Sequence, residues 1–392
     1  MAKSKRRGHH EGSVFYLANR DRWVVDVSVS LGKRKRYYFR TKQEAVRKKN
    51  EILREVERGT LATGPQRKLG EYLVDWIENV HKDKLRISTY VKYRKLIQYI
   101  VPELGGVWLQ KLTPEQVRQF YTKMGKEGGA QEQGLSTKTV HEIHGVLHLA
   151  LENAVRWGYV SRNVCDLVDP PSIVSREPTP LTLEQAQAFL KSVREHRLEV
   201  LLSVAVVTGM RRGELVALRW SNIDFERGTL LVLHTVDYIP KYGYVETEPK
   251  TKAGKRSIRL PSFLVGMLKE HRTGILERQL KVGQAWENRD LVFPDLHGGY
   301  FNPGYLDKLF KKLLCESGVP HMHLHDLRHS AATILLAMGV NIKVIQELLG
   351  HSDIAITLRV YGHLLPSMQA EAVEKWESVF NREDERANGE GG

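Results

Sequence analysis

The chain has 392 residues, and its 60 Lys and Arg outnumber 46 Asp and Glu, which gives a formal net charge of +14. The hydrophobic fraction of 41% and charged fraction of 27% exclude collagen-like and low-complexity chains. Two cysteines without a CxxC pair exclude a disulfide scaffold and a cysteine-ligated zinc site. The start MAKSKRRGHH lacks the apolar core of a signal peptide, and Val200 to Val207 is far shorter than the roughly 20 residues that span a bilayer. We therefore expect a cytoplasmic protein without a membrane partner.

The first predicted domain, residues 1–62, carries most of the positive charge, because residues 1–60 contain 17 Lys and Arg against 7 Asp and Glu. Strands are expected at 13–17, 23–29 and 36–39, followed by a helix that begins at a Thr41 and Glu44 capping box and ends at Arg58. Such a sheet could enter a DNA major groove. A basic surface that only maintains solubility is the alternative. The candidate DNA contacts are Arg20, Arg22, Lys33, Arg34, Lys35 and Arg36.

The second predicted domain, residues 63–170, follows a linker at 59–65 and is all-helical. Helices are expected over 69–80, from a Ser88 cap to Tyr99, from Thr113 with Pro114 at the first helical position, and over 136–157. Basic residues near the start of the second helix suit phosphate contacts but are equally typical of a solvated face. The candidates are Lys92, Arg94 and Lys95.

The third predicted domain, residues 171–382, begins in a proline-rich linker and is of mixed α+β type, mainly helical with a small antiparallel sheet. Helices are expected at 182–194, 198–207 and 213–218, strands near 230–234, 244–246 and 257–260, and helices from there to Phe380. The sequence from 383 to 392 is polar and glycine-rich, which predicts a disordered tail.

Three stretches of the third domain contain cations that suit phosphate binding. In Thr208 to Glu214, Arg211 is followed three residues later by Glu214, whose carboxylate could hold the planar guanidinium in place. The segment 249–258 predicts a basic hairpin with Ala253 and Gly254 at its tip. Lys250, Lys252 and Lys255 are the three candidates for a hairpin lysine that contacts phosphate. In the third stretch, His325 and Arg328 are three residues apart and share a face if the segment is helical.

Two further stretches lie near the C-terminus: His351 follows a glycine, and Tyr361 comes ten residues later. Each stretch alone has an ordinary explanation, and a lone tyrosine is nearly always a packing residue. The ordered set, however, resembles the active site of the tyrosine recombinases, or phage integrases. That family is similar in having, in this order, an Arg in a TGxRxxE stretch, a Lys directly before the turn of a hairpin, an HxxR motif, a His or Trp after glycine, and a nucleophilic Tyr. The resemblance implies that the catalytic residues are Arg211, Lys252, His325, Arg328, His351 and Tyr361, supported by Glu214 and Asp326.

The resemblance also implies an integrase of a phage or integrative mobile element, with arm-type, core-site and catalytic domains in that order. Such an enzyme would cut and rejoin double-stranded DNA at attachment sites through a 3′ phosphotyrosine, without a metal ion, ATP or another cofactor. Members of the family act as tetramers on DNA, so nucleoid association is expected. A host DNA-bending protein and an excision factor are candidate partners. The amphipathic stretch 367–380 is a candidate for docking on a neighbouring subunit, or for packing on its own domain.

The proposed roles follow from charge. Two arginines could neutralise the extra negative charge of the pentavalent phosphorus, while a histidine base helps to remove the phenolic proton and a lysine protonates the leaving 5′ oxygen. His351 would hydrogen-bond a nonbridging oxygen.

Three alternative functions are considered. A type IB topoisomerase would use similar residues, and a DNA-binding regulator would lack catalysis. A metal-dependent hydrolase would use a histidine cluster to bind its metal ion. That cluster is His321, His323, His325 and His329.

Overall fold

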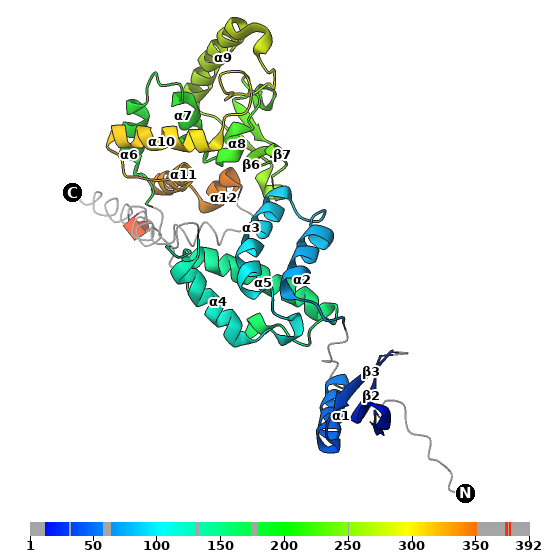
Figure 1. Ribbon diagram of the computed structural model, residues 1–392. Coiled ribbons are helices and arrows are strands. Elements are labelled where there is room, and N and C mark those ends of the chain that lie inside the picture. The colour runs from blue at the N-terminus through cyan, green and yellow to red at the C-terminus, as the bar shows by residue number, and fades with distance from the viewer. Residues whose placement is uncertain are drawn as a thin grey trace, which may run out of the picture. The chain divides into compact units, whose positions relative to one another are not determined.

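The computed structural model describes residues 12–30, 33–57, 64–129, 133–173, 179–249, 251–350, 373–374 and 376–377, except for the side chains of 29, 30, 33 and 55–57. The chain divides into two compact units, Met1–Ser175 and Arg176–Gly392 (Figure 1). Among the described helices, none is both long enough and apolar enough to cross a membrane. Lys250, His351, Tyr361, most of the terminal amphipathic stretch and the tail 383–392 lie outside the described residues.

The N-terminal part contains the predicted antiparallel sheet, with strands β1 (Ser13–Leu17), β2 (Arg22–Ser30) and β3 (Lys33–Phe39) in that order. Helix α1 (Lys42–Glu57) covers one face and buries apolar side chains of β2. The Thr41 and Glu44 capping box is present. Strand β3 begins earlier than predicted, because the basic residues 33–35 pair with β2 instead of forming a turn.

The four main helices of the next part are α2 (Leu69–Asp75), continued by a π-helical turn (Trp76–His81), α3 (Ile87–Leu104), α4 (Pro114–Glu127) and α5 (Thr137–Arg156). They enclose one apolar core. The predicted start of α4 at Thr113 and Pro114 is confirmed, and Thr113 forms a capping box with Gln116. Ser136, expected as the first residue of α5, is its N-cap and accepts a hydrogen bond from the Thr139 amide.

The prediction that Ser88 caps the second helix is wrong. The Arg86 carbonyl already accepts a hydrogen bond from the Tyr90 amide, so Arg86 is the cap residue and Ser88 lies inside α3. The helix also extends past Tyr99 to Leu104, because Ile100 and Leu104 continue its buried face. Pro102 is tolerated near the C-terminal end of the helix.

The second unit begins with α6 (Leu183–Ser192), α7 (Glu199–Thr208) and α8 (Arg212–Val216), and it ends, within the described residues, with α9 (Ser262–Val282), α10 (Pro303–Ser317), α11 (Asp326–Ala337) and α12 (Ile342–Leu349). Between them lie a sheet of β4 (Ile223–Asp224), β5 (Thr229–Val232) and β8 (Arg256–Arg259), and a hairpin of β6 (Thr235–Ile239) and β7 (Gly243–Thr247). The main apolar core includes the edge-to-face pair of Phe189 and Phe310. This mixed, mainly helical architecture agrees with the predicted fold class.

The predicted hairpin over 249–258 is wrong. Strand β7 pairs with β6, whereas β8 pairs with β5, so the flanks of this segment belong to two different sheets. The reason is burial: Ile258 of β8 lies opposite Leu230 of β5, and both side chains are in the core. Lys252–Gly254 forms a short 3₁₀ turn between the sheets. The strands β4 and β6 were not predicted from the sequence.

Candidate functional site

The C-terminal ends of α7 and α12 meet through two glycines. Gly209 ends α7 and Gly350 ends α12, each with a left-handed φ, 60° and 68°. A Cβ atom at Gly209 would lie 2.4 Å from Leu349 Cδ2, and one at Gly350 would lie 2.6 Å from the Ala253 carbonyl oxygen of the 252–254 turn. Both the backbone conformation and the close approach therefore require glycine.

Arg211 follows this junction and is held by Glu214. The Arg211 amide donates to Glu214 Oε2 at 2.9 Å, and Arg211 Nη1 donates to Oε1 at 2.8 Å. The Glu214 side chain is 2% exposed and that of Arg211 is 39% exposed. The carboxylate thus fixes one edge of a guanidinium that is still partly exposed to solvent, which is the arrangement expected from the TGxRxxE spacing.

A third residue, Arg256 of β8, was not singled out from the sequence. Its side chain is 5% exposed, and it donates from Nη2 to Glu214 Oε2 at 2.9 Å and from Nη1 to Oε1 at 3.2 Å. Burial raises the pKa of Glu214, but the hydrogen bonds and charge of Arg256, together with Arg211, hold it below its usual value. Strand alternation could have found Arg256, because it shares a face with buried Ile258 two residues later.

Three arginines meet at the end of α12. The carbonyl of Leu348 accepts from Arg256 Nε at 2.6 Å, and that of Leu349 accepts from Arg328 Nη2, also at 2.6 Å. The carbonyl of Gly350 accepts from Arg211 Nη2 at 3.5 Å. The last carbonyls of a helix lack partners within it and carry partial negative charge, so guanidinium groups suit this position. The chain continues from here toward His351 and Tyr361.

Arg328 is the most enclosed of these arginines, with 3% of its surface exposed. Its Nη1 donates to the Gly209 carbonyl at 2.9 Å, so its guanidinium bridges the ends of α7 and α12. Arg211 and Arg328 bond to consecutive carbonyls, which brings their charges together. Among the described residues, the junction brings three arginines to one buried carboxylate, that of Glu214.

His325 lies directly before α11, at its N-cap position rather than inside the helix. Partial burial, followed by the charges of His329 and Arg328, lowers the pKa of His325 to about 4. The imidazole is therefore neutral near pH 7 and able to accept a proton. Asp326 stabilises the preceding turn, because its Oδ2 accepts from the His323 amide at 2.7 Å.

The two described lysines of the 252–254 turn differ in their partners. Lys255 Nζ forms an ion pair with Glu248 Oε2 at 2.8 Å. The Lys252 side chain is exposed and forms no hydrogen bond or ion pair with any described residue, although its carbonyl accepts from the Lys255 amide at 3.1 Å. The geometry therefore favours Lys252 over Lys255 as the cation available to a ligand, and Lys250 is outside the described residues.

Within the described ranges, no three His, Cys, Asp or Glu side chains are arranged to hold a metal ion. The clustered histidines form two ring pairs instead, His321 with His323 at 6.3 Å and His325 with His329 at 5.6 Å between centroids.

Comparisons with known proteins identify this architecture. The model of the phage integrase family matches residues 180–368, and that of the phage integrase N-terminal SAM-like domain matches 68–125. A "Tyrosine recombinase XerC-like" protein of Caldanaerobacter subterraneus is 32% identical over 380 residues, covering 90% of this chain and 96% of the relative. The chain belongs to the phage integrase family of tyrosine recombinases. It is accordingly a DNA strand-transferring enzyme.

Solved structures with the same fold include integrases bound to DNA. The Tn1549 transposon integrase in complex with transposon right end DNA aligns with a TM-score of 0.67 and 22% identity, over 78% of this chain and 99% of that one. A lambda integrase tetramer bound to a Holliday junction aligns with a TM-score of 0.52 and 17% identity, over 87% of this chain and 95% of that one.

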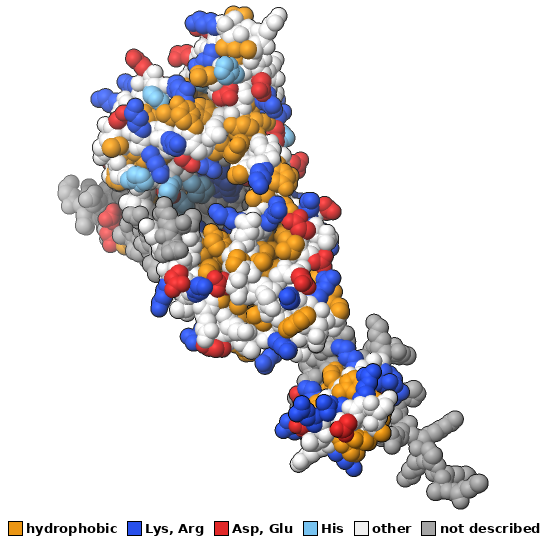
Figure 2. All heavy atoms as spheres, in the orientation of Figure 1, with side chains coloured by type: hydrophobic (Ala, Val, Ile, Leu, Met, Phe, Trp, Pro, Cys, Tyr) orange, Lys and Arg blue, Asp and Glu red, His pale blue; other side chains and the backbone are white. Residues whose placement is uncertain are grey.

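The basic residues predicted to contact DNA in the recombinase's N-terminal part lie on different faces of the sheet. Arg22, Arg34 and Arg36 share the face opposite α1, whereas Lys35 alternates with them toward the helix-covered face. A largely buried carboxylate, Asp26, pairs with Arg34 Nε at 3.4 Å and with Arg36 Nε at 3.0 Å. Figure 2 shows Lys and Arg side chains gathered on this part of the surface. The Lys33 side chain is outside the described residues.

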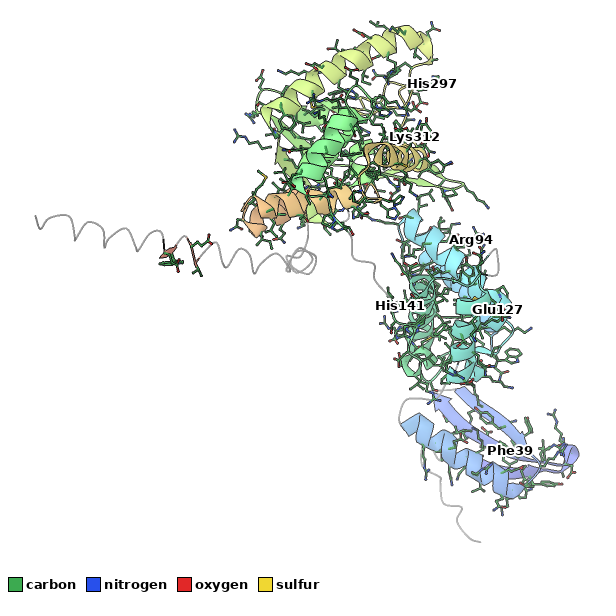
Figure 3. The ribbon with its side chains drawn as sticks, turned by 90° about the vertical axis from the view of Figure 1, so that its left-hand side faces the viewer. Phe39, Arg94, Glu127, His141, His297 and Lys312 are labelled. Atoms are coloured by element: carbon green, nitrogen blue, oxygen red, sulfur yellow. The ribbon has the colours of Figure 1, made fainter. Side chains whose placement is uncertain are left out.

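The predicted cations of α3 are partly paired. Lys92 contacts Glu142 at 2.9 Å, and Arg94, labelled in Figure 3, contacts Glu78 at 3.2 Å. Lys95 is exposed and has no ion pair among the described residues. Both paired cations remain more than half exposed, so a phosphate could compete for them.

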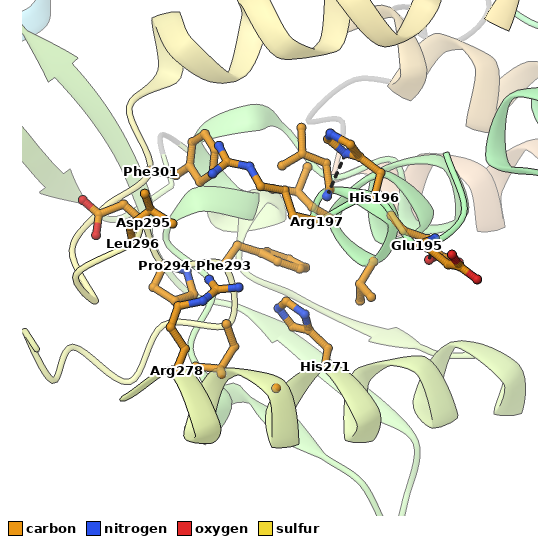
Figure 4. Close-up of a pocket in the computed structure, with 16 residues that line it drawn as sticks. Glu195, His196, Arg197, His271, Arg278, Phe293, Pro294, Asp295, Leu296 and Phe301 are labelled. Carbon is orange, nitrogen blue, oxygen red and sulfur yellow. Dashed lines mark hydrogen bonds between the residues drawn. The ribbon is translucent and has the colours of Figure 1, made fainter. Parts of the chain in front are cut away.

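A cavity of about 180 Å³ in the recombinase lies away from the arginine junction, between residues 195–201, α9 and the segment 293–301 (Figure 4). None of the proposed catalytic residues lines it. Both histidines that line it have partners within the protein: His196 Nδ1 accepts from the Leu198 amide at 3.2 Å, and His271 Nε2 contacts the Val292 carbonyl at 2.8 Å.

The lowered pKa of His325 predicts a pH effect on stability. The unfolded chain takes up a proton below its ordinary pKa of 6.5, whereas folded His325 stays neutral to about 4, so stability falls as the pH drops through this window. The melting temperature of His325→Gln should therefore fall less than that of wild type when the pH is lowered from about 7.5 to about 5. The exposed His297 (Figure 3) provides the control, His297→Gln. If the melting temperature of His325→Gln fell as much as that of wild type, the lowered pKa of His325 would be contradicted.

Proposed function

We propose that this recombinase is the integrase of a phage or another integrative element, and that Tyr361 cuts DNA by forming a 3′ phosphotyrosine, without a metal ion or ATP. One observation carries the proposal: Arg211 presents an accessible guanidinium beside Arg328, at a junction whose described residues include three arginines and one buried carboxylate. Such a surplus of fixed positive charge suits a phosphate that gains negative charge during substitution. The junction also lies directly before His351 and Tyr361 in the chain.

The proposed cleavage balances without a cofactor. The Tyr361 oxygen forms a bond to phosphorus as its proton passes to a base, a role that we assign to the neutral imidazole of His325. The bond from phosphorus to the 5′ oxygen breaks, and Lys252 supplies the proton to that oxygen. Arg211 and Arg328 neutralise the equatorial oxygens, and His351 donates to one of them. The phosphotyrosine retains the energy of the broken bond, so a 5′ hydroxyl of another strand can displace Tyr361.

The three predicted domains are proposed to divide DNA binding between them. Residues 1–62 would bind arm-type sites through the open sheet face, residues 63–170 would bind the core site, residues 171–382 would cut it, and 383–392 would form a tail. The separate apolar cores of these parts support this division. A tetramer on paired attachment sites is part of the proposal, supported by the shared fold with lambda integrase, which has been solved as a tetramer. Cytoplasmic location, the bending protein and the excision factor stay predictions.

Covalent trapping tests the proposed chemistry. Wild-type protein is incubated in chelator and without ATP with nicked duplexes that span the ends of the DNA element encoding this chain, labelled on the 5′ side of the scissile strand. A labelled protein–DNA species on a denaturing gel, together with a free 5′ hydroxyl on the other fragment, is the expected result. Binding on a native gel without an adduct, with or without added Mg²⁺, would instead favour a DNA-binding regulator. Adducts accompanied only by relaxation of supercoils would favour a topoisomerase.

Deleting residues 1–62 should spare cleavage of a minimal core site but weaken recombination on a full attachment site. The deleted sheet contributes the arm contacts, while the α2–α5 core and the arginine junction use none of its side chains. Trapping on a core duplex and recombination between full sites are measured in parallel. Equal recombination by the full and shortened chains would remove the arm-binding role.

A further inference from the structure

The Arg256 side chain connects three separate segments of the site. Besides its two bonds to Glu214 of α8, its Nη1 donates to the Gly254 carbonyl at 3.2 Å, within the turn that carries Lys252. Its Nε donates to the Leu348 carbonyl at the end of α12. One planar guanidinium thus spans the lysine turn, the carboxylate that holds Arg211, and the helix end that leads to His351.

We propose that Arg256 is a positioning residue for strand cleavage. It sets the orientation of Glu214 and, through Glu214, the guanidinium of Arg211, and it fixes the lysine turn against the end of α12. This inference rests on the proposed function, because it assigns Arg256 a part in the same phosphate site. Arg256 does not itself touch the DNA, since its side chain is 5% exposed and its donors are directed at protein oxygens.

The charges explain why Arg256 affects Arg211. Glu214 is 2% exposed and shares two cations, Arg211 and Arg256. If Arg256 were lost, Arg211 alone would have to neutralise the buried carboxylate, which would draw its guanidinium toward Glu214 and away from a phosphate. Lysine could not replace Arg256, because one ammonium cannot span the Leu348 carbonyl, the Gly254 carbonyl and both carboxylate oxygens in the fixed directions of a guanidinium.

A general structural brace is a weaker explanation, because β8 is held without this side chain. Its backbone pairs with β5 from Thr229 opposite Arg259 to Val232 opposite Arg256, and buried Ile258 anchors it in the core. Among the described residues, the partners of the Arg256 guanidinium all belong to the junction described above. Removing the guanidinium should therefore disturb the site more than the strand.

The test compares Arg256→Met and Arg256→Lys with a matched control, Arg259→Met, which alters an exposed arginine of the same strand. Each variant is given nicked duplexes whose scissile linkage is either a normal phosphodiester or a neutral methylphosphonate. The methylphosphonate lacks the negative charge that Arg211 neutralises, so cleavage of it depends less on Arg211 placement. DNA affinity is measured on a native gel and thermal stability by melting.

We expect Arg256→Met to cut the phosphodiester about 10²-fold more slowly than wild type, at similar DNA affinity, because a misplaced arginine resembles a lost one. The ratio of phosphodiester to methylphosphonate rates should fall in both Arg256 variants and stay at the wild-type value in Arg259→Met. An equal loss on both substrates would overturn the positioning role and leave a structural one. Full recovery of phosphodiester cleavage by Arg256→Lys would also overturn it.

If Arg256→Met does not fold, Arg256→Lys, which keeps a cation beside Glu214, supplies the same comparison of substrates. A fallen rate ratio in folded Arg256→Lys supports the positioning role, and an unchanged ratio overturns it. Failure of the proposed function is recognised separately, because wild type would then give no adduct with the phosphodiester. The Arg256 inference alone fails when wild type forms the adduct and the variants match its rate ratio.

Discussion

A Tyr361→Phe variant should bind an attachment-site duplex as tightly as wild type and yet leave no covalent adduct. The change removes only the phenolic oxygen, which is the atom that bonds to phosphorus in the proposed reaction. The cations proposed to contact DNA and the three arginines of the junction keep their side chains. Loss of a nucleophile typically lowers turnover by about 10⁴-fold or more, so the adduct should fall below detection. Denaturing gels with the label on the 5′ side of the scissile strand measure it.

Tyr242→Phe is a matched control for this change. Tyr242 is an exposed tyrosine of the same unit, in the turn of the β6–β7 hairpin, and is not a part of the arginine junction. Its variant should form the adduct at the wild-type rate. An adduct that persisted in Tyr361→Phe would assign the nucleophile to another hydroxyl. Loss of the adduct in both variants would contradict a specific role for Tyr361.

Local hydrogen bonds were the part of the fold that the sequence predicted well. The capping box of Thr41 with Glu44 and the start of a helix at Thr113 and Pro114 depend only on residues close together in the chain, so spacing suffices to recognise them. The pairing of Arg211 with Glu214 is equally local. In these cases the chain needs no information from distant segments.

Contacts between distant segments were not predictable in the same way. The hairpin expected at 249–258 failed because Ile258 finds its apolar partner, Leu230, in β5 rather than in the neighbouring strand. Arg256 was missed because its partners, Glu214 and the Leu348 carbonyl, are 42 and 92 residues away. Strand alternation indicates that Arg256 lies on the buried face of its strand, but its role is recognised only when the carboxylate and carbonyls that compensate its burial are known.

The family resemblance predicted which residues belong to the site but not how they are held. The spacing of His325 and Arg328 suggested one helix face, whereas His325 lies before α11 and Arg328 reaches across to the ends of two other helices. Sequence motifs record residue types and their order. The meeting of the arginines at the C-terminal end of α12 depends instead on the packing of α11 and α12 around Leu336 and Leu349.

An Arg328→Lys variant should lose both stability and cleavage, even though it retains the positive charge. Arg328 bridges the Gly209 and Leu349 carbonyls with two separate nitrogens in a site that is 3% exposed. A single ammonium cannot occupy both positions, so one buried carbonyl would be left unpaired, at a cost of about 1–3 kcal/mol. The same substitution removes the planar guanidinium donor from the proposed phosphate site, which should slow cleavage by about 10²- to 10³-fold.

Melting curves and single-turnover trapping separate these two effects, and Arg259→Lys is the control because it makes the same change at an exposed arginine of the same unit. Arg259→Lys should match wild type in both measurements. Raising the stability of the Arg328 variant by working at lower temperature should restore its folded fraction but not its cleavage rate, because the missing donor geometry persists in the folded protein. Cleavage at the wild-type rate by folded Arg328→Lys would show that charge alone suffices, and would limit Arg328 to joining α7 and α12.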